Sequence, residues 1–441
     1  MCSGAQCHFP SLILTFVRRD PIVTVLATIL ITALITVLML NLSSGEKKIQ
    51  KRIATRYHVG DAQFLRSMGT LLGPPIVGGN RVTPLRNGVA IFPAMLEAIT
   101  AGKRTITFET FIYWSGSIGR DFADALSERA RAGVKIHVLL DWVGSTQMDA
   151  ELLEQLEQAG VDLRRYHPPR WYTVSKMNNR THRKLLVVDG TVGFTGGVGI
   201  GDPWLGNAQD KEHWRDSHYR LDGPAVAHMQ AAFLDNWMKA SGELLHGEEY
   251  FPALPPQGEV NAQLFRSDPG EGAGSVRLMY LLSIASAKTS VRIAAAYFVP
   301  DDLSIETLVA ARRRGVHVEL IVPGPLVDTA LTRRASRARW GKLLGSGVII
   351  HEYQPTMYHC KMMIVDDIWT SVGSTNFDNR SFRLNDEANL NVYDRAFAAT
   401  QIADFENDRA RSRQVTFEMW KNRPWQQKFV DHAAALLRSQ L

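Results

Sequence analysis

The chain has 441 residues, and its hydrophobic share of 45% with a charged share of 21% excludes a wholly disordered protein. The 50 lysine and arginine residues exceed the 44 aspartate and glutamate residues, so the net charge of +6 mildly favours anionic partners such as phosphates or an acidic lipid surface. There are 3 cysteines, which excludes a disulfide framework and fits a reducing compartment. The length predicts roughly two or three domains.

Residues 21–41 follow an N-terminal tail (1–20) and contain the uncharged run IVTVLATILITALITVLML. At about 1.5 Å per residue this run reaches roughly 28 Å, close to the thickness of a bilayer's hydrocarbon core. We predict a transmembrane helix here. A cleaved signal peptide is the alternative, but the leader is long and no A-x-A site follows the run.

Positive charges flank this segment unequally. Arg18 and Arg19 precede it, whereas a basic neck (42–56) follows with more positive residues: Lys47, Lys48, Lys51, Arg52 and Arg56. Because cytoplasmic flanks carry the excess of lysine and arginine, this bias predicts a single pass through the cell (inner) membrane, with the body of the chain on the cytoplasmic side.

The body of the chain alternates strand-like and helix-like segments. RTITFETFIYW (104–114) is apolar and β-branched, DFADALSERARAG (121–133) has helical spacing, and VKIHVLLDW (134–142) again resembles a strand. This alternation is typical of an α/β fold.

The α/β pattern occurs twice. HRKLLVVDGTVGFTGG in the first half corresponds to HCKMMIVDDIWTSVGS in the second, and GEEYFPALPPQGE (247–259) between the halves is typical of a linker. We therefore predict two similar lobes, 57–246 and 260–441, each a mixed sheet flanked by helices, with one active site between them. The C-terminal residues combine tryptophan and basic residues with an apolar helical stripe, which fits either contact with lipid headgroups or docking on the core.

Each half carries the motif H-x-K-x4-D, which places His182 and Lys184, and likewise His359 and Lys361, two residues apart. Alternate residues of a strand share a face, so each pair points one imidazole and one ammonium group into a common space. A single copy of so short a motif is weak evidence, but two copies at equivalent points of a duplicated fold are not expected by chance. Core histidines and surface lysines are the alternative, and the repetition disfavours it.

Two histidines and two lysines that converge suit the chemistry of a phosphodiester. One neutral imidazole attacks phosphorus to form a phosphohistidine, and the other, protonated, donates to the leaving oxygen. The lysines bind the non-bridging oxygens and stabilise the charge of the transition state. This arrangement predicts no metal and no cofactor.

Further carboxylates accompany the two motifs. Asp216 and Glu387 occupy matching positions, 34 and 28 residues after the respective histidines, and we predict that they orient the imidazole rings. Asp189 and Asp366 complete the two motifs and count among the candidate catalytic residues. Their place at strand ends nevertheless favours a structural hydrogen-bonding role.

Small-residue turns follow both motifs. Gly197 in the first half, and Ser374 and Asn376 in the second, are candidates for phosphate binding through backbone amides and polar side chains. The alternative is that glycine and serine serve only as turn formers there.

At these residues the chain resembles the phospholipase D superfamily, and within it the bacterial cardiolipin synthases. The similarity runs from about residue 75 to the C-terminus and includes THRKLLVVDGTVGFTGGVGIGDPW and GSTNFDNRSF. It implies a two-lobed α/β fold and ping-pong phosphatidyl transfer, with His182 as the nucleophile and His359 as the general acid. The nearly symmetric sequence alone does not choose between the two histidines.

The leading hypothesis is a membrane-anchored cardiolipin synthase that transfers a phosphatidyl group from phosphatidylglycerol to a second phospholipid, either phosphatidylglycerol or phosphatidylethanolamine. A hydrolytic phospholipase D, a phospholipase D-type nuclease and a catalytically silent membrane scaffold are the alternatives. The predicted anchor argues against nucleic acid as a partner, and the two intact motifs argue against a scaffold. The sequence does not define the oligomeric state.

Overall fold

The computed structural model describes residues 21–42, 51–54, 57–168, 178–268 and 275–441, without the side chains of 38–42 and 275. The chain divides into two compact units, Met1–Gly45 and Glu46–Leu441.

The first unit contains the helix α1 (Pro21–Leu42), which has 22 residues and no acidic residue in its first turn. Its apolar side chains are exposed, among them Ile22 at 68% and Leu30 at 63%. The sequence predicts that this segment crosses a membrane; within the described ranges, no helix is both long and apolar enough to do so.

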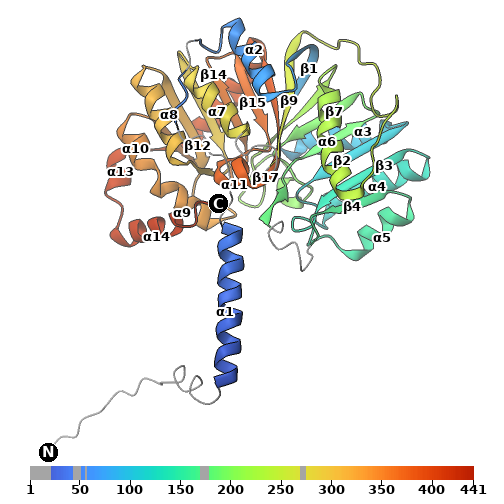
Figure 1. The fold of residues 1–441 in the computed structure, drawn as a ribbon. Coiled ribbons are helices and arrows are strands. Elements are labelled where there is room, and N and C mark those ends of the chain that lie inside the picture. The colour runs from blue at the N-terminus through green and yellow to red at the C-terminus, as the bar shows by residue number, and fades with distance from the viewer. Residues whose placement is uncertain (1–20, 43–50, 55–56, 169–177, 269–274) are drawn as a thin grey trace, which may run out of the picture. The chain divides into compact units, whose positions relative to one another are not determined.

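The second unit is built on one mixed sheet, to which its two halves contribute equivalent strands (Figure 1). In the described residues of the first half the order is β1-β8-β7-β6-β2-β3-β4, in which β2, β3 and β4 run parallel and the other pairs run antiparallel. The strands of this half are β1 (Val77–Arg86), β2 (Thr105–Thr110), β3 (Lys135–Asp141), β4 (Asp162–Tyr166), β6 (Leu185–Val188), β7 (Val192–Gly196) and β8 (Ser217–Asp222).

The second half repeats this order as β9-β17-β15-β14-β10-β12-β13, with β18 added at the edge. Its strands are β9 (Val260–Ser267), β10 (Ser290–Ala295), β12 (His317–Pro323), β13 (Ile349–Tyr353), β14 (Lys361–Val365), β15 (Trp369–Gly373), β17 (Asn385–Tyr393) and β18 (Ser412–Val415). The antiparallel pair β1–β9 joins the two halves, so the sheet is continuous between them. Two short strands, β11 (Phe298–Val299) and β16 (Phe377–Asp378), pair apart from this sheet.

Helices cover the faces of the sheet (Figure 1). Those of the first half are α2 (Ala62–Leu72), α3 (Asn87–Ala101), α4 (Ser117–Arg131), α5 (Ala150–Gln158) and α6 (Val226–Ser241), with the 3-10 turn η2 (Asp202–Trp204). Those of the second half are α7 (Ser275–Ala285), α8 (Asp302–Arg313), α9 (Ala330–Ala338), α10 (Trp340–Gly345), α11 (Asn379–Arg383), α12 (Arg395–Ala410), α13 (Phe417–Lys421) and α14 (Trp425–Ala435).

One hydrophobic core is shared between the halves. Phe233 and Trp237 of α6 belong to the same buried cluster as Phe397 and Phe405 of α12. A second core lies within the first half and a third within the second half. Helix α2 of the first half packs on the core of the second half, where its Phe64 lies edge-on against Trp369. Because interiors are close-packed, the shared core fixes the two halves against each other.

The predicted α/β class with two similar lobes is confirmed, but the strands of the two lobes form one continuous mixed sheet rather than two separate sheets. The repeated strand order explains why the duplication is visible in the sequence, since equivalent strands need the same pattern of buried residues. Residues 247–259, the predicted linker, lie between α6 and β9. The exact lobe boundaries stay a prediction.

Candidate active site

The two motif histidines lie where each half pairs with the other. His182 follows the short strand β5 (Arg180–Thr181), which pairs with β17, and its backbone N–H donates to the carbonyl of Asp386 at 2.9 Å. The backbone N–H of His359 likewise donates to the carbonyl of Arg215 at 2.8 Å. Each donor therefore belongs to one half of the sheet and its acceptor to the other, so backbone pairing brings the two motifs together.

The two carboxylates contact the histidines in exchanged order. Nδ1 of His182 lies 3.0 Å from both carboxylate oxygens of Glu387, and Nδ1 of His359 lies 2.7 Å from Oδ2 of Asp216. The sequence positions leave open which carboxylate contacts which histidine, and the structure pairs each histidine with the carboxylate of the other half. The cause is the backbone pairing, since each histidine is hydrogen-bonded to the residue immediately before the other half's carboxylate.

Burial sets the protonation of the two histidines. It lowers the pKa of His182 to about 4, although Glu387 opposes the shift. Burial, followed by the charge of Lys361, also lowers the pKa of His359. The His182 ring is therefore neutral near pH 7 in the free site. Because the carboxylates engage Nδ1 of both rings, Nε2 is the nitrogen of each ring that is left to react.

The motif lysines are buried beside their histidines. Nζ of Lys184 donates to the carbonyl of His182 at 2.8 Å, and Nζ of Lys361 donates to the carbonyl of His359 at 2.6 Å. Burial lowers the pKa of Lys184 to about 7 and also lowers that of Lys361. The charge of Lys361 contributes to lowering the pKa of both Lys184 and His182, so the two halves of the site share one electrostatic environment.

The motif aspartates lie at the far ends of the strands. The carboxylate of Asp189 accepts the backbone N–H groups of Lys103, Arg104 and Thr105 at 2.7 to 3.2 Å. The carboxylate of Asp366 accepts the equivalent amides of residues 288–290. Five residues separate each aspartate from its lysine, roughly 16 Å along a strand. Neither touches the histidines in the described structure, so these contacts match the structural role rather than the catalytic one.

The small residues after each motif support the carboxylates. The backbone amides of Gly197 and Ser374 donate to the carbonyls of Ser217 and Ala388, each at 3.0 Å. The Ser374 hydroxyl donates to Glu387. A Cβ at Gly197 would lie 2.2 Å from Oδ1 of Asp216, so only glycine fits there. These groups are engaged within the protein, and phosphate binding by either residue stays a prediction.

Asn376 is the third predicted phosphate ligand. Its side chain is buried, and its Oδ1 atom has no hydrogen-bond partner among the described residues. Its backbone N–H donates to the Ser381 hydroxyl at 3.2 Å. A role in phosphate binding therefore stays a prediction for this side chain as well.

Aromatic side chains that the sequence reasoning did not identify enclose both histidines. Phe111 packs against His182, with ring centroids 5.3 Å apart. Three aromatic rings pack against His359: Trp204, Trp214 and Tyr297. The indole Nε1 of Trp204 also donates to Asp216 at 2.9 Å. The sequence signal for the two tryptophans was their position in GDPW (Trp204) and HWRD (Trp214), close to the first motif and to Asp216. Tryptophan is so often a core residue that the sequence alone does not distinguish a core role from a role in the site.

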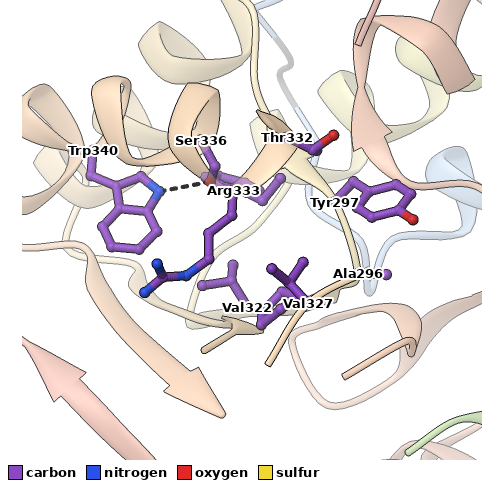
Figure 2. A pocket seen from close by; sticks show the side chains of 10 residues that line it. Ala296, Tyr297, Val322, Val327, Thr332, Arg333, Ser336 and Trp340 are labelled. Atoms are coloured by element: carbon purple, nitrogen blue, oxygen red, sulfur yellow. Dashed lines mark hydrogen bonds between the residues drawn. The ribbon is translucent and has the colours of Figure 1, made fainter. Parts of the chain in front are cut away.

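A small cavity lies behind Tyr297, between α9 and the end of β12 (Figure 2). Its volume of about 10 Å³ for a water-sized sphere has room for roughly one water. Trp340 donates from Nε1 to the Ser336 hydroxyl at 3.0 Å in its wall. The cavity is too small for a lipid headgroup, and Tyr297, which lines it, also packs edge-on against His359 with ring centroids 6.4 Å apart.

Comparisons with known proteins agree with this duplicated site. A family model described as cardiolipin synthase, PLD-like domain, matches residues 95–218 and again residues 280–409. The first match contains His182 and Asp216, and the second contains His359 and Glu387. The family match thus repeats at the two halves of the sheet.

Two curated relatives and one solved structure are similar over most of the chain. The cardiolipin synthase of Alkalihalophilus pseudofirmus is 33% identical over 86% of this chain and 76% of its own length. The major cardiolipin synthase of Bacillus subtilis is 33% identical over 81% of this chain and 75% of its own length. The phosphatidylserine synthase of Haemophilus influenzae has a TM-score of 0.66 at 15% identity, covering 85% of this chain and 99% of that chain, which shows a shared fold.

Two PLD-like domains, each contributing one H-x-K motif to a common site, define a protein of the phospholipase D superfamily. Within that class the chain belongs to the cardiolipin synthase family, and it is a phosphatidyltransferase.

Proposed function

We propose that this site makes cardiolipin from phosphatidylglycerol through a phosphohistidine on His182. Nε2 of His182 attacks the phosphorus, and the bond from phosphorus to the terminal glycerol oxygen breaks. That oxygen takes the Nε2 proton of His359, which begins the cycle as the imidazolium that Asp216 stabilises, and glycerol leaves. A hydroxyl of a second phospholipid, phosphatidylglycerol in the leading case, then returns the proton to His359 as its oxygen displaces the histidine from phosphorus.

The crossed hydrogen bonds of the two histidines are the observation that carries this proposal. A carboxylate on Nδ1 fixes the tautomer that leaves Nε2 free to react, and it stabilises the imidazolium formed when the ring takes a proton. Glu387 serves His182 in this way and Asp216 serves His359. The ammonium groups of Lys184 and Lys361 stabilise the charge on the phosphoryl oxygens.

The surroundings of the two rings favour His182 as the nucleophile. Nζ of Lys361 lies 3.1 Å from both Nδ1 and Nε2 of His359, so its positive charge lies against that ring. No comparable contact at Nε2 of His182 occurs within the described residues. The open Nε2 and the low pKa of His182 support attack by its neutral ring, and the carboxylate of Asp216 supports the protonated form of His359 as the proton donor.

Two measurements test the proposal. The purified chain, incubated with vesicles of phosphatidylglycerol, should release one glycerol per cardiolipin formed. Acid-quenched protein should carry labelled phosphatidyl on His182, and His182→Ala should carry none, whereas His359→Ala should retain a slow burst of labelled protein. Phosphatidic acid as the main product would instead establish hydrolysis, and label on His359 would reverse the roles of the histidines.

We further propose that α1 anchors the chain in the cell (inner) membrane, with the catalytic body on the cytoplasmic side. The uncharged α1 sequence and its exposed apolar side chains support the anchor, and the basic neck supports the orientation. The intact chain should stay with the membrane fraction after a high-salt wash, and a chain without residues 1–45 should be released. In sealed spheroplasts the body should resist external protease. Cleavage there would overturn the orientation.

A further inference from the structure

The C-terminal helix α14 has one face packed on the protein. Asp431 and Ala434 are buried in the contact with α9. Oδ2 of Asp431 lies 3.3 Å from Nε of Arg423 and 4.0 Å from Nε of Arg337, so its charge is neutralised inside this contact. The packing therefore fixes which face of α14 points outward.

The outward face is apolar and exposed. Trp425 is 71% exposed, Phe429 69% and Leu436 83%, and Leu437 is 51% exposed just beyond the helix. Positions 425, 429 and 436 are separated by four and seven residues, which places them along one side of a helix. Scattered single apolar residues are normal on a protein surface, but a contiguous stripe with an exposed tryptophan marks an interaction site.

Positive charge borders this stripe. Lys421 and Arg438 are exposed at its two ends, and Lys428 is half-buried beside it. The exposed acidic residue of the same segment is Glu418, and Asp302 of α8 lies 3.7 Å from Nη2 of Arg438. Asp431 contributes no outward negative charge because it is buried and paired. An apolar stripe with basic residues at its borders fits an anionic lipid surface, into which such helices insert by their apolar face.

The end of this segment lies beside the active site. Arg380 of α11 donates from its backbone N–H to the carbonyl of Leu441 and from Nη1 to the carbonyl of Gln440, both at 3.0 Å. The charge of Glu387, the partner of His182, acts on the same Arg380 guanidinium. Figure 1 shows the C-terminus beside α11 and β17. The residues that follow α14 thus reach the arginine on which the charge of Glu387 acts.

We propose that the exposed stripe Trp425, Phe429, Leu436 and Leu437 is an interfacial docking surface that inserts into an anionic phospholipid bilayer and presents the site to lipids in that bilayer. The lipid chains cover the stripe, and the headgroup phosphates contact Lys421, Lys428 and Arg438. Docking is separate from the chemical step, so it is required for substrate in a bilayer and not for substrate dissolved in water. The proposal uses cardiolipin synthesis only as its activity readout.

The test measures the activity of the full chain on phosphatidylglycerol in two forms, in vesicles and dissolved in water. The double variant Trp425→Glu/Phe429→Glu should lower kcat/KM on phosphatidylglycerol vesicles by at least about tenfold, because it replaces inserted apolar groups with anions. Its rate on dihexanoyl-phosphatidylglycerol below the micelle concentration should stay within about twofold of the parent. Leu71→Glu/Leu244→Glu, which makes the same change at residues 64% and 61% exposed on other elements, is the matched control and should keep both rates.

A second readout does not depend on activity. Brominated phosphatidylglycerol in the vesicles should quench the part of the fluorescence that Trp425→Phe removes, and an equal amount of brominated phosphatidylcholine should quench it less. Equal vesicle rates for parent and double variant, equal losses on both substrate forms, or unquenched Trp425 would each overturn docking. A change from dimer to monomer in the double variant would instead identify the stripe as an interface between copies of this chain.

Discussion

The proposed mechanism depends most on the ionised carboxylates of Glu387 and Asp216. Each is buried, and burial alone would raise the pKa of its carboxyl group. The neighbouring histidine and lysine charges outweigh that effect and lower the pKa of both groups. Both carboxylates therefore stay ionised at neutral pH, as an acceptor for a histidine N–H must.

Glu387→Gln should remove the group that fixes the tautomer of His182. We expect kcat to fall by about three orders of magnitude, since the ring loses both its orientation and the stabilisation of its protonated form. Nitrogen-15 spectra of histidine-labelled protein would show the change at His182 with His359 undisturbed, and Asp216→Asn should do the reverse. A Glu387→Gln variant that shifts His359 instead would contradict the crossed pairing.

Lys184 makes substrate binding dependent on pH. Its pKa of about 7 in the free site means that the ammonium form is lost as the pH rises through 7. A bound phosphate anion favours the ammonium form, so binding raises this pKa, and affinity should fall by up to about tenfold per pH unit above it. Inhibition by inorganic phosphate between pH 6 and 9 measures this effect. Lys184→Gln should bind phosphate weakly at every pH, and an unchanged profile in that variant would assign the titration to another group.

At the scale of elements, the aspartates that end the two motifs stabilise turns between strands. Asp189 and Asp366 both have φ of 53°, in the left-handed region that aspartate and asparagine tolerate. Each carboxylate accepts backbone amides at the start of a neighbouring strand. The same aspartate recurs because the same turn recurs, so its repetition reflects folding as well as chemistry.

Asp189→Asn should therefore lower stability without removing activity. The substitution keeps a residue that tolerates positive φ but loses the charge that accepts several amides, which we expect to cost about 1.5 to 3 kcal/mol of unfolding free energy. Thermal unfolding measures the loss, and kcat at a temperature where both proteins are folded should stay within about threefold. Asp366→Asn is the matched variant in the other half. A loss of kcat with normal stability would instead indicate that these aspartates take part in catalysis.

At the scale of the whole molecule, a buried ion pair links the halves directly behind the site. Nε and Nη2 of Arg215 lie 3.0 and 2.9 Å from the carboxylate oxygens of Asp408 on α12. Nη1 of the same arginine donates to the carbonyl of Asp216 at 2.6 Å. The backbone of Asp216, whose carboxylate contacts His359, is thus held by an arginine that is paired with the second half.

Asp408→Ala should leave Arg215 charged and unpaired in the interior. Breaking a buried pair in this way costs about 3 to 5 kcal/mol, so we expect a large drop in the unfolding midpoint. The distortion should also reach Asp216 and lower kcat. Arg409, whose Nε lies 3.8 Å from Glu319 and which is half-exposed, provides a control: Arg409→Ala should change stability by less than about 1 kcal/mol. Equal effects of the two substitutions would contradict the linking role of the buried pair.

The sequence by itself determined the duplication and the α/β class, and it predicted the histidines, the lysines and the two accompanying carboxylates of the candidate site. These features are local: the spacing of two residues predicts that His182 and Lys184, which lie between β5 and β6, share a face. Equivalent strands repeat the same burial pattern. The recurrence of the motif at equivalent positions then indicated a shared phosphodiester site. The structure places all six of these side chains in one environment.

Only the tertiary structure decided which carboxylate serves which histidine. That choice depends on the pairing of β5 with β17 and of Arg215 with Tyr358, contacts between segments more than 140 residues apart in the sequence. The enclosing aromatic rings and the link from Arg215 to Asp408 arise in the same way. The spacing of residues along the chain predicts the helix or strand to which each residue belongs. The order in which strands pair across the duplicated sheet depends on the packing of the whole molecule, and no local sequence pattern encodes it.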